Sequence, residues 1–244
     1  MDLPSAGIIA GLGTAAGLGL LAGGYAYASK WPASQIFGET LIAPRTPQEL
    51  ALTFDDGPNA TWTLRLLDTL AEHEVRATFF LLGSRAQAEP ELVRRIAGAG
   101  HLIGNHSWSH PNLSLCGKSR IHEELSRTSD ELEQIAGMRV KFFRPPFGAR
   151  RPAALRIARE LGMVPVMWNA MTSDWEEPRA ERIAERLIEK IQRVTQAGSA
   201  ANIVLHDGGH RDPGANREPS VTAAGLLCSR YKATHRFVRV DAWG

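Results

Sequence analysis

Residues 52–58, Leu-Thr-Phe-Asp-Asp-Gly-Pro, place two adjacent carboxylates where an apolar run ends in a turn. Asp55 and Asp56 repel each other when both are ionised, so a cation bound to one of them makes the arrangement favourable. A strand-like apolar run that ends in polar residues is typical of α/β proteins, which gather their chemistry at the downstream ends of strands. This stretch therefore indicates both a strand and a functional site.

Two histidines further along the chain complete a candidate metal site. His106 and His110 lie in the stretch Gly104-Asn105-His106-Ser107-Trp108-Ser109-His110. One carboxylate and two imidazoles form a ligand set that leaves coordination positions open for water and substrate, as a catalytic metal requires. The second carboxylate is then free to act as a base, which is the chemistry of metal-assisted hydrolysis.

Strand-like apolar runs alternate with amphipathic stretches of helical period throughout the chain after residue 48. The strand candidates are 50–54, 77–82, 101–104, 140–143, 164–168, 202–205 and 236–240. The helix candidates are 64–70, 91–97, 121–135, 153–161, 180–194 and 221–231. This alternation predicts an α/β fold with a mostly parallel sheet, either an open doubly wound sheet or a closed barrel.

Composition limits the classes of partner. The 244 residues are 43% hydrophobic and 22% charged, which suffices for one sizeable core and a single barrel-type domain. With 28 basic and 26 acidic side chains and no basic block, the chain is not expected to bind nucleic acid. The two cysteines, Cys116 and Cys228, have no metal-ligand spacing, and free thiols are favoured over a disulfide between them.

The N-terminal residues form a separate apolar segment. Residues 7–28 carry no charge and are rich in Gly, Ala and Leu, which is long enough to span a bilayer as a helix. A signal peptide that ends at Ala26-Tyr27-Ala28 and a buried glycine-rich helix are the alternatives. We expect residues 1–30 to attach the protein to a membrane or direct its export to the cell envelope, with the side of the membrane left open, and residues 31–47 to be a connector.

Five motifs follow one another in an order that resembles the polysaccharide deacetylase family, carbohydrate esterase family 4. They are Thr53-Phe54-Asp55-Asp56-Gly57-Pro58, His106-Ser107-Trp108-Ser109-His110, Arg144-Pro145-Pro146-Phe147-Gly148, Asp174-Trp175 and Val204-Leu205-His206-Asp207. The resemblance spans about residues 48–241. It implies a catalytic domain over residues 48–244, folded as a distorted (β/α) barrel of about seven strands and preceded by the apolar N-terminal helix. Met171 departs from the family pattern, which often has aspartate there.

The resemblance also implies a role for each motif residue. The metal ligands would be Asp56, His106 and His110, with zinc as the first choice of metal and cobalt or nickel as alternatives. Asp55 would be the general base, oriented by Arg144, and His206 the general acid, supported by Asp174. The backbone N–H of Phe147 would stabilise the oxyanion, and Trp175 would cover the acetyl methyl group. The remaining histidines are interpreted as surface or packing residues: His73, His101, His122, His210 and His235.

These residues predict a metal-dependent hydrolase that removes an N-acetyl group from an amino sugar in a glycan or glycolipid. Its substrate would be an acetylated glycan or an amino-sugar lipid. An O-acetyl esterase that acts on a polysaccharide would use the same residues. A non-catalytic glycan-binding protein with the same fold is the second alternative, but the metal ligands, base and acid are all retained, which argues against it.

Overall fold

The computed structural model describes residues 23–244, and residues 23–30 form a helix. The greater part of the predicted apolar helix, residues 7–22, lies outside the described residues. Within residues 23–244 no helix is both long and apolar enough to cross a membrane.

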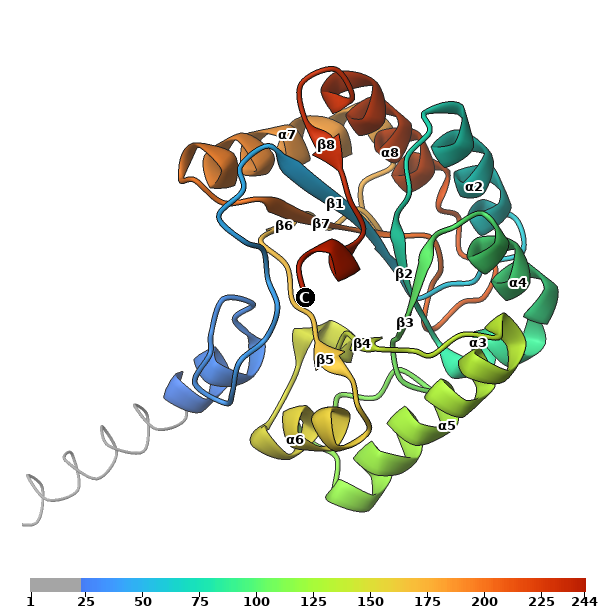
Figure 1. The fold of residues 1–244 in the computed structure, drawn as a ribbon, viewed down its shortest axis with the longest axis vertical. Coiled ribbons are helices and arrows are strands. Elements are labelled where there is room, and N and C mark those ends of the chain that lie inside the picture. The colour runs from blue at the N-terminus through green and yellow to red at the C-terminus, as the bar shows by residue number, and fades with distance from the viewer. Residues whose placement is uncertain (1–22) are drawn as a thin grey trace, which may run out of the picture.

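In the described residues, seven parallel strands form a curved half-barrel in the order β5-β4-β3-β2-β1-β7-β6 (Figure 1). An eighth short strand, β8, pairs with the first residues of β1. The strands are β1 (Glu49–Asp55), β2 (Thr78–Leu81), β3 (Leu102–Asn105), β4 (Phe142–Phe143), β5 (Val164–Pro165), β6 (Ala170–Met171), β7 (Ala201–His206) and β8 (Arg236–Phe237). The prediction of a distorted barrel with about seven strands is confirmed.

The connector lies across the gap between the edge strands. Leu41 pairs in parallel with Val166, and its carbonyl accepts a hydrogen bond from Met167 N. Asn202 Nδ2, from β7, donates to the carbonyls of Ile42 and Met167. These bonds link the β5 side of the opening to the β7 side, so the curvature of the half-barrel is fixed there.

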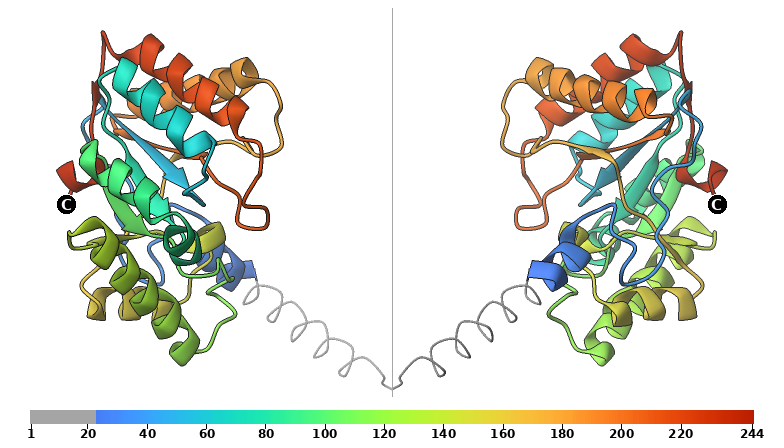
Figure 2. Two further views of the ribbon diagram at one scale, coloured as in Figure 1. Left: turned by 90° about the vertical axis from the view of Figure 1, so that its right-hand side faces the viewer. Right: turned by 90° about the vertical axis from the view of Figure 1, so that its left-hand side faces the viewer.

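Helices surround the outer face of the sheet (Figures 1 and 2). The helices are α2 (Trp62–Glu72), α3 (Gly83–Ala88), α4 (Pro90–Gly98), α5 (Lys118–Ala136), α6 (Pro152–Glu160), α7 (Ala180–Gln196) and α8 (Glu218–Tyr231), with 3-10 turns η1 (Pro146–Gly148) and η2 (Val240–Ala242). In α7 the buried side chains Ile183, Leu187 and Ile191 recur every fourth residue, which directs one face of the helix into the core.

Side-chain alternation along β1 divides the core into two layers. Leu50, Leu52 and Phe54 pack in the cluster beneath the helices. Ala51 belongs to a second cluster inside the half-barrel. Because successive side chains of a strand point to opposite faces, Asp55 shares the inner face with Ala51 and reaches the interior at the carboxyl end of the strand.

The helix candidates after residue 48 are confirmed, whereas three strand predictions need correction. The candidate 140–143 is too long, because β4 covers only Phe142–Phe143. The candidate 164–168 is too long, because β5 ends at Pro165 and the chain then crosses the opening to form β6 at the other edge. The candidate 236–240 contains β8 and the start of η2. The helix α3 has only six residues and no apolar repeat, so the sequence pattern did not predict it. Both cysteines are free thiols, as predicted.

A buried arginine attaches the N-terminal segment to the barrel. Arg150 is fully buried, and its guanidinium donates to the carbonyls of Ser29, Trp31, Ser34 and Gly148 at 2.8–3.2 Å. Residues 29–34 thus pack against the turn η1, which borders the cavity described below.

Candidate active site

The carboxylate pair lies where β1 meets the loop after β7. Asp55 is the last residue of β1 and is in register with His206, the last residue of β7. Asp56 has a φ of 71°, which turns the chain away from the strand. A Cβ on Gly208 would lie 2.2 Å from the Asp56 carbonyl oxygen, so only glycine permits this close approach. The adjacent ends of β1 and β7 therefore bring Asp56 against the loop that follows His206.

The loop after β3 presents the two histidines to Asp56. Asn105 Oδ1 accepts a hydrogen bond from Ser107 N, and Ser107 Oγ accepts one from His110 N. Ser107 and His110 both have positive φ values, 69° and 58°. Such backbone strain persists only where surrounding bonds hold it, and here it directs both imidazoles to one side of the loop.

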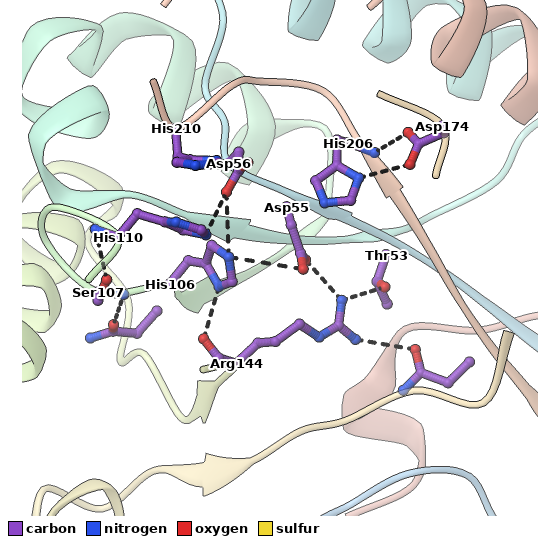
Figure 3. A network of polar contacts seen from close by, with 12 residues as sticks. Thr53, Asp55, Asp56, His106, Ser107, His110, Arg144, Asp174, His206 and His210 are labelled. Carbon is purple, nitrogen blue, oxygen red and sulfur yellow. Dashed lines mark hydrogen bonds and ion pairs between the residues drawn. The ribbon is translucent and has the colours of Figure 1, made fainter. Parts of the chain in front are cut away.

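Asp56, His106 and His110 form a group whose ligand atoms lie within 4.8 Å of one another (Figure 3). Asp56 Oδ1 lies 3.1 Å from His110 Nε2 and 3.5 Å from His106 Nε2. His106 Nδ1 donates to the Arg144 carbonyl at 2.8 Å, which leaves a lone pair on Nε2 for the site. Asp56 Oδ1 is buried and accepts no hydrogen bond from the described residues. A buried acceptor beside two imidazole nitrogens fits a divalent cation.

Burial and neighbouring charge set the protonation of this group. Burial opposes ionisation of Asp56, but the adjacent imidazoles outweigh it and hold the pKa of Asp56 well below its usual range. Burial lowers the pKa of His110 to about 4, although Asp56 opposes the shift. A carboxylate and a neutral imidazole at pH 7 are the forms that bind metal.

Asp55 is held by a buried arginine. Arg144 Nη1 donates to Asp55 Oδ1 at 2.8 Å and to Thr53 Oγ1 at 2.6 Å. The same guanidinium reaches Asn202 Oδ1 at 3.3 Å and lies 4.1 Å from the centre of the Phe80 ring. Asp55 Oδ2 lies 3.9 Å from His106 Nε2, so the oxygen that Arg144 does not bind faces the metal group.

A second carboxylate–imidazole pair lies at the end of β7. His206 Nδ1 contacts Asp174 Oδ1 at 2.8 Å, and Asp174 Oδ2 accepts hydrogen bonds from His206 N and Ser220 Oγ. Burial disfavours the charged imidazole, but Asp174, with Asp56 and Asp55, outweighs it and raises the pKa of His206 to about 9. His206 is therefore an imidazolium at neutral pH. Trp175 packs edge-on against it, with ring centres 4.9 Å apart.

These groups open into one cavity of about 590 Å³. The predicted residues that line it are Asp55, Asp56, His106, His110, Phe147, Trp175 and His206. Arg144 and Asp174 do not line the cavity but lie behind Asp55 and His206, to which they are bonded. Trp168 and Met171 form an apolar part of the cavity wall. At residue 171 the cavity therefore has a thioether where the family often has a carboxylate. Phe147 adopts a φ of 57° and remains 51% exposed.

The interpretation of His210 as a surface or packing residue is wrong. His210 lines the cavity, and its Nδ1 lies 3.3 Å from Asp56 Oδ2. Its ring stacks on His110 with centres 4.2 Å apart and an angle of 22° between the planes. The sequence signal was the pair Gly208-Gly209 after the last motif, which lets the chain turn back toward β1. By contrast, His101 is a packing residue as predicted, and its Nδ1 accepts a hydrogen bond from Ala77 N.

Comparison with known proteins agrees with the resemblance seen in the motifs. The family profile described as polysaccharide deacetylase matches residues 43–166. A peptidoglycan-N-acetylglucosamine deacetylase of Bacillus cereus is 36% identical over 200 residues, which cover 82% of this chain and 69% of that protein. A chitooligosaccharide deacetylase of Rhizobium leguminosarum bv. trifolii is 36% identical over 165 residues, covering 66% and 72%. A crystal structure of a peptidoglycan N-acetylglucosamine deacetylase superposes with a TM-score of 0.74 at 34% identity, covering 83% of this chain and 91% of the other.

Proposed function

The chain belongs to the polysaccharide deacetylase family, and we propose that it hydrolyses the N-acetyl group of an amino sugar within a glycan, releasing acetate and a free amine. One observation carries the proposal. A single cavity contains a metal-ligand group, an arginine-bound carboxylate and a histidine whose pKa is raised to about 9. Amide hydrolysis needs an activated water, a base and an acid for the leaving group, and these side chains match the three requirements.

Asp56, His106 and His110 would hold the divalent metal, with zinc first and cobalt or nickel as alternatives. When bound, the metal supplies Lewis-acid polarisation and the activation of water. Asp55 accepts the proton of the attacking water. Arg144 binds Oδ1 of Asp55, which leaves Oδ2 as the oxygen available for that proton.

His206 protonates the nitrogen of the leaving amine. An amide nitrogen is a poor leaving group until it gains a proton, so the acid must still be charged at the pH of turnover. Asp174 keeps the imidazole charged and fixes its Nδ1, which leaves Nε2 for the substrate. The backbone N–H of Phe147 stabilises the oxyanion, and Trp175 packs against the acetyl methyl group.

The substrate proposed first is N-acetylglucosamine in a cell-wall or chitin-like glycan, because the relatives named above act on peptidoglycan and chitooligosaccharides. For the same reason we propose that the protein is exported to the cell envelope. Membrane attachment through residues 7–28 and an amino-sugar lipid substrate are finer proposals, which rest on the uncharged N-terminal stretch alone.

The test is a substrate panel. Purified full-length protein loaded with Zn²⁺ is incubated with chitooligosaccharides, peptidoglycan fragments and acetylated xylan, and released acetate is measured. We expect release from the amino-sugar substrates and loss of that release in Asp55→Asn. Release from xylan alone would identify an O-acetyl esterase, and binding without release from any substrate would support the non-catalytic alternative.

A further inference from the structure

The two oxygens of the Asp56 carboxylate have different partners. Oδ1 faces His106 and His110, whereas Oδ2 lies 3.3 Å from Nδ1 of His210 (Figure 3). A carboxylate that binds a metal through one oxygen can rotate about its Cβ–Cγ bond. A donor on the second oxygen removes that freedom, as outer-shell partners of metal ligands do.

His210 also contacts a second member of the metal group. Its ring stacks on that of His110, at 4.2 Å between centres and 22° between the planes. The Phe147 ring meets both imidazoles edge-on, at 4.4 Å from His110 and 5.2 Å from His210. One side chain from the loop after β7 thus contacts a ligand from the turn after β1 and a ligand from the loop after β3.

The backbone around His210 is held in place. Arg217 Nε donates to the Gly208 carbonyl at 2.7 Å, and Arg85 Nη2 lies 3.5 Å from the carbonyl oxygens of Gly209 and His210. Gly208 itself packs against the Asp56 backbone. These contacts hold the loop in place, and the loop therefore keeps the imidazole of His210 next to Asp56.

We propose that His210 is a positioning residue that tightens metal binding by orienting Asp56 through an Nδ1–H···Oδ2 hydrogen bond. The inference rests on the metal site of the proposed function. The group with mutually close ligand atoms contains Asp56, His106 and His110 but not His210, so His210 supports the ligands without joining them.

Two substitutions separate the hydrogen bond from the ring stacking. His210→Asn keeps an N–H donor near the position of Nδ1 and removes the ring. His210→Phe keeps a ring that stacks on His110 and removes the donor. His122→Phe, at an exposed histidine of α5, is the matched control.

The measurement is the Zn²⁺ dissociation constant of the full-length metal-free protein, by competition with a chromophoric chelator. We expect His210→Phe to weaken binding ~10- to 100-fold, His210→Asn to stay near wild type and His122→Phe to have no effect. Wild-type affinity in His210→Phe, or equal losses in the Phe and Asn variants, would overturn the proposal. The melting temperature of each metal-free variant shows whether folding contributes. Metal affinity is read without substrate, so the outcome is independent of whether the deacetylase assignment holds.

Discussion

The cavity contains two carboxylate–imidazole groups that are built from the same residue types, but the pKa of a histidine is lowered in one group and raised in the other. Asp56 is shared by several imidazoles, and burial lowers the pKa of His110 to about 4. Asp174 contacts a single imidazole, that of His206, at 2.8 Å. With Asp56 and Asp55 it raises the pKa of His206 to about 9 despite burial. At neutral pH the first group offers lone pairs to a cation, while the second offers a proton to a leaving group. The surroundings, and not the residue types, assign the roles.

Burial disfavours the charged form of both His110 and His206, so the difference follows from the neighbouring charges, which outweigh burial at His206 but not at His110. Around His110, the neighbouring His106 and His210 disfavour a further positive charge, so Asp56 does not offset the burial that lowers the pKa of His110. Asp174 is already held by His206 N and Ser220 Oγ on its second oxygen, and its first oxygen is left for one ring. Together with Asp56 and Asp55, this carboxylate outweighs the burial of His206 and favours its charged form.

The largest expected effect comes from removing a ligand from the first group. In His110→Ala the metal should be lost and kcat/KM should fall about 10³-fold or more, because a Lewis acid contributes several kcal/mol to the barrier. Metal content per chain and acetate release are measured together, with His122→Ala as the control. Full metal occupancy in His110→Ala would remove His110 from the ligand set.

Breaking the second group should affect substrates unequally. His206→Ala should slow amide cleavage ~10²- to 10⁴-fold, the range of general acid catalysis. An activated acetyl ester has a leaving group that needs no proton, so its hydrolysis should fall far less. Rates on both substrates are compared in the same preparations. Equal losses on amide and ester would show that His206 is not the leaving-group acid.

Weakening the Asp174–His206 pair without removing the imidazole should shift the basic limb of the pH profile of kcat/KM. His206 is protonated below its pKa of about 9, so the basic limb of kcat/KM for the wild type should lie near pH 9. Asp174→Asn removes the charge that raises this pKa while the burial that lowers it remains. The basic limb should therefore shift to lower pH, with activity best retained in acid. A limb that stays near pH 9 in the variant would assign it to another group.

The smallest effect is expected at Phe147, whose ring packs edge-on against His110 and His210 and exchanges no proton. Its side chain is 51% exposed, and the proposed role uses only the backbone N–H. Phe147→Tyr should change kcat/KM about twofold or less, within the range of surface substitutions. A loss beyond tenfold would show that the ring itself positions His110 or substrate.

The motif residues could be predicted from the sequence because they resemble the family motifs, and the apolar runs before several of them become strands of the half-barrel. Asp55 and His206 end β1 and β7, which are adjacent strands, so their proximity follows from the topology. His210 could not be predicted in this way. Its position depends on the contact between Gly208 and the Asp56 backbone, which joins residues about 150 positions apart and leaves no periodic signal. The contacts of Arg150 could not be predicted either. Its partners are the backbone carbonyls of Ser29, Trp31 and Ser34, which no pattern of side chains reveals.

The opposite protonation of the two groups can be measured directly by an NMR titration of the histidine side chains in metal-free protein, with His110→Ala and His206→Ala used to assign the signals. His110 should remain neutral until the pH falls to about 4, and His206 should remain charged until the pH rises to about 9. Titration of both imidazoles near the ordinary histidine pKa of about 6.5 would refute the division of the cavity into a metal-binding group and a proton-donating group.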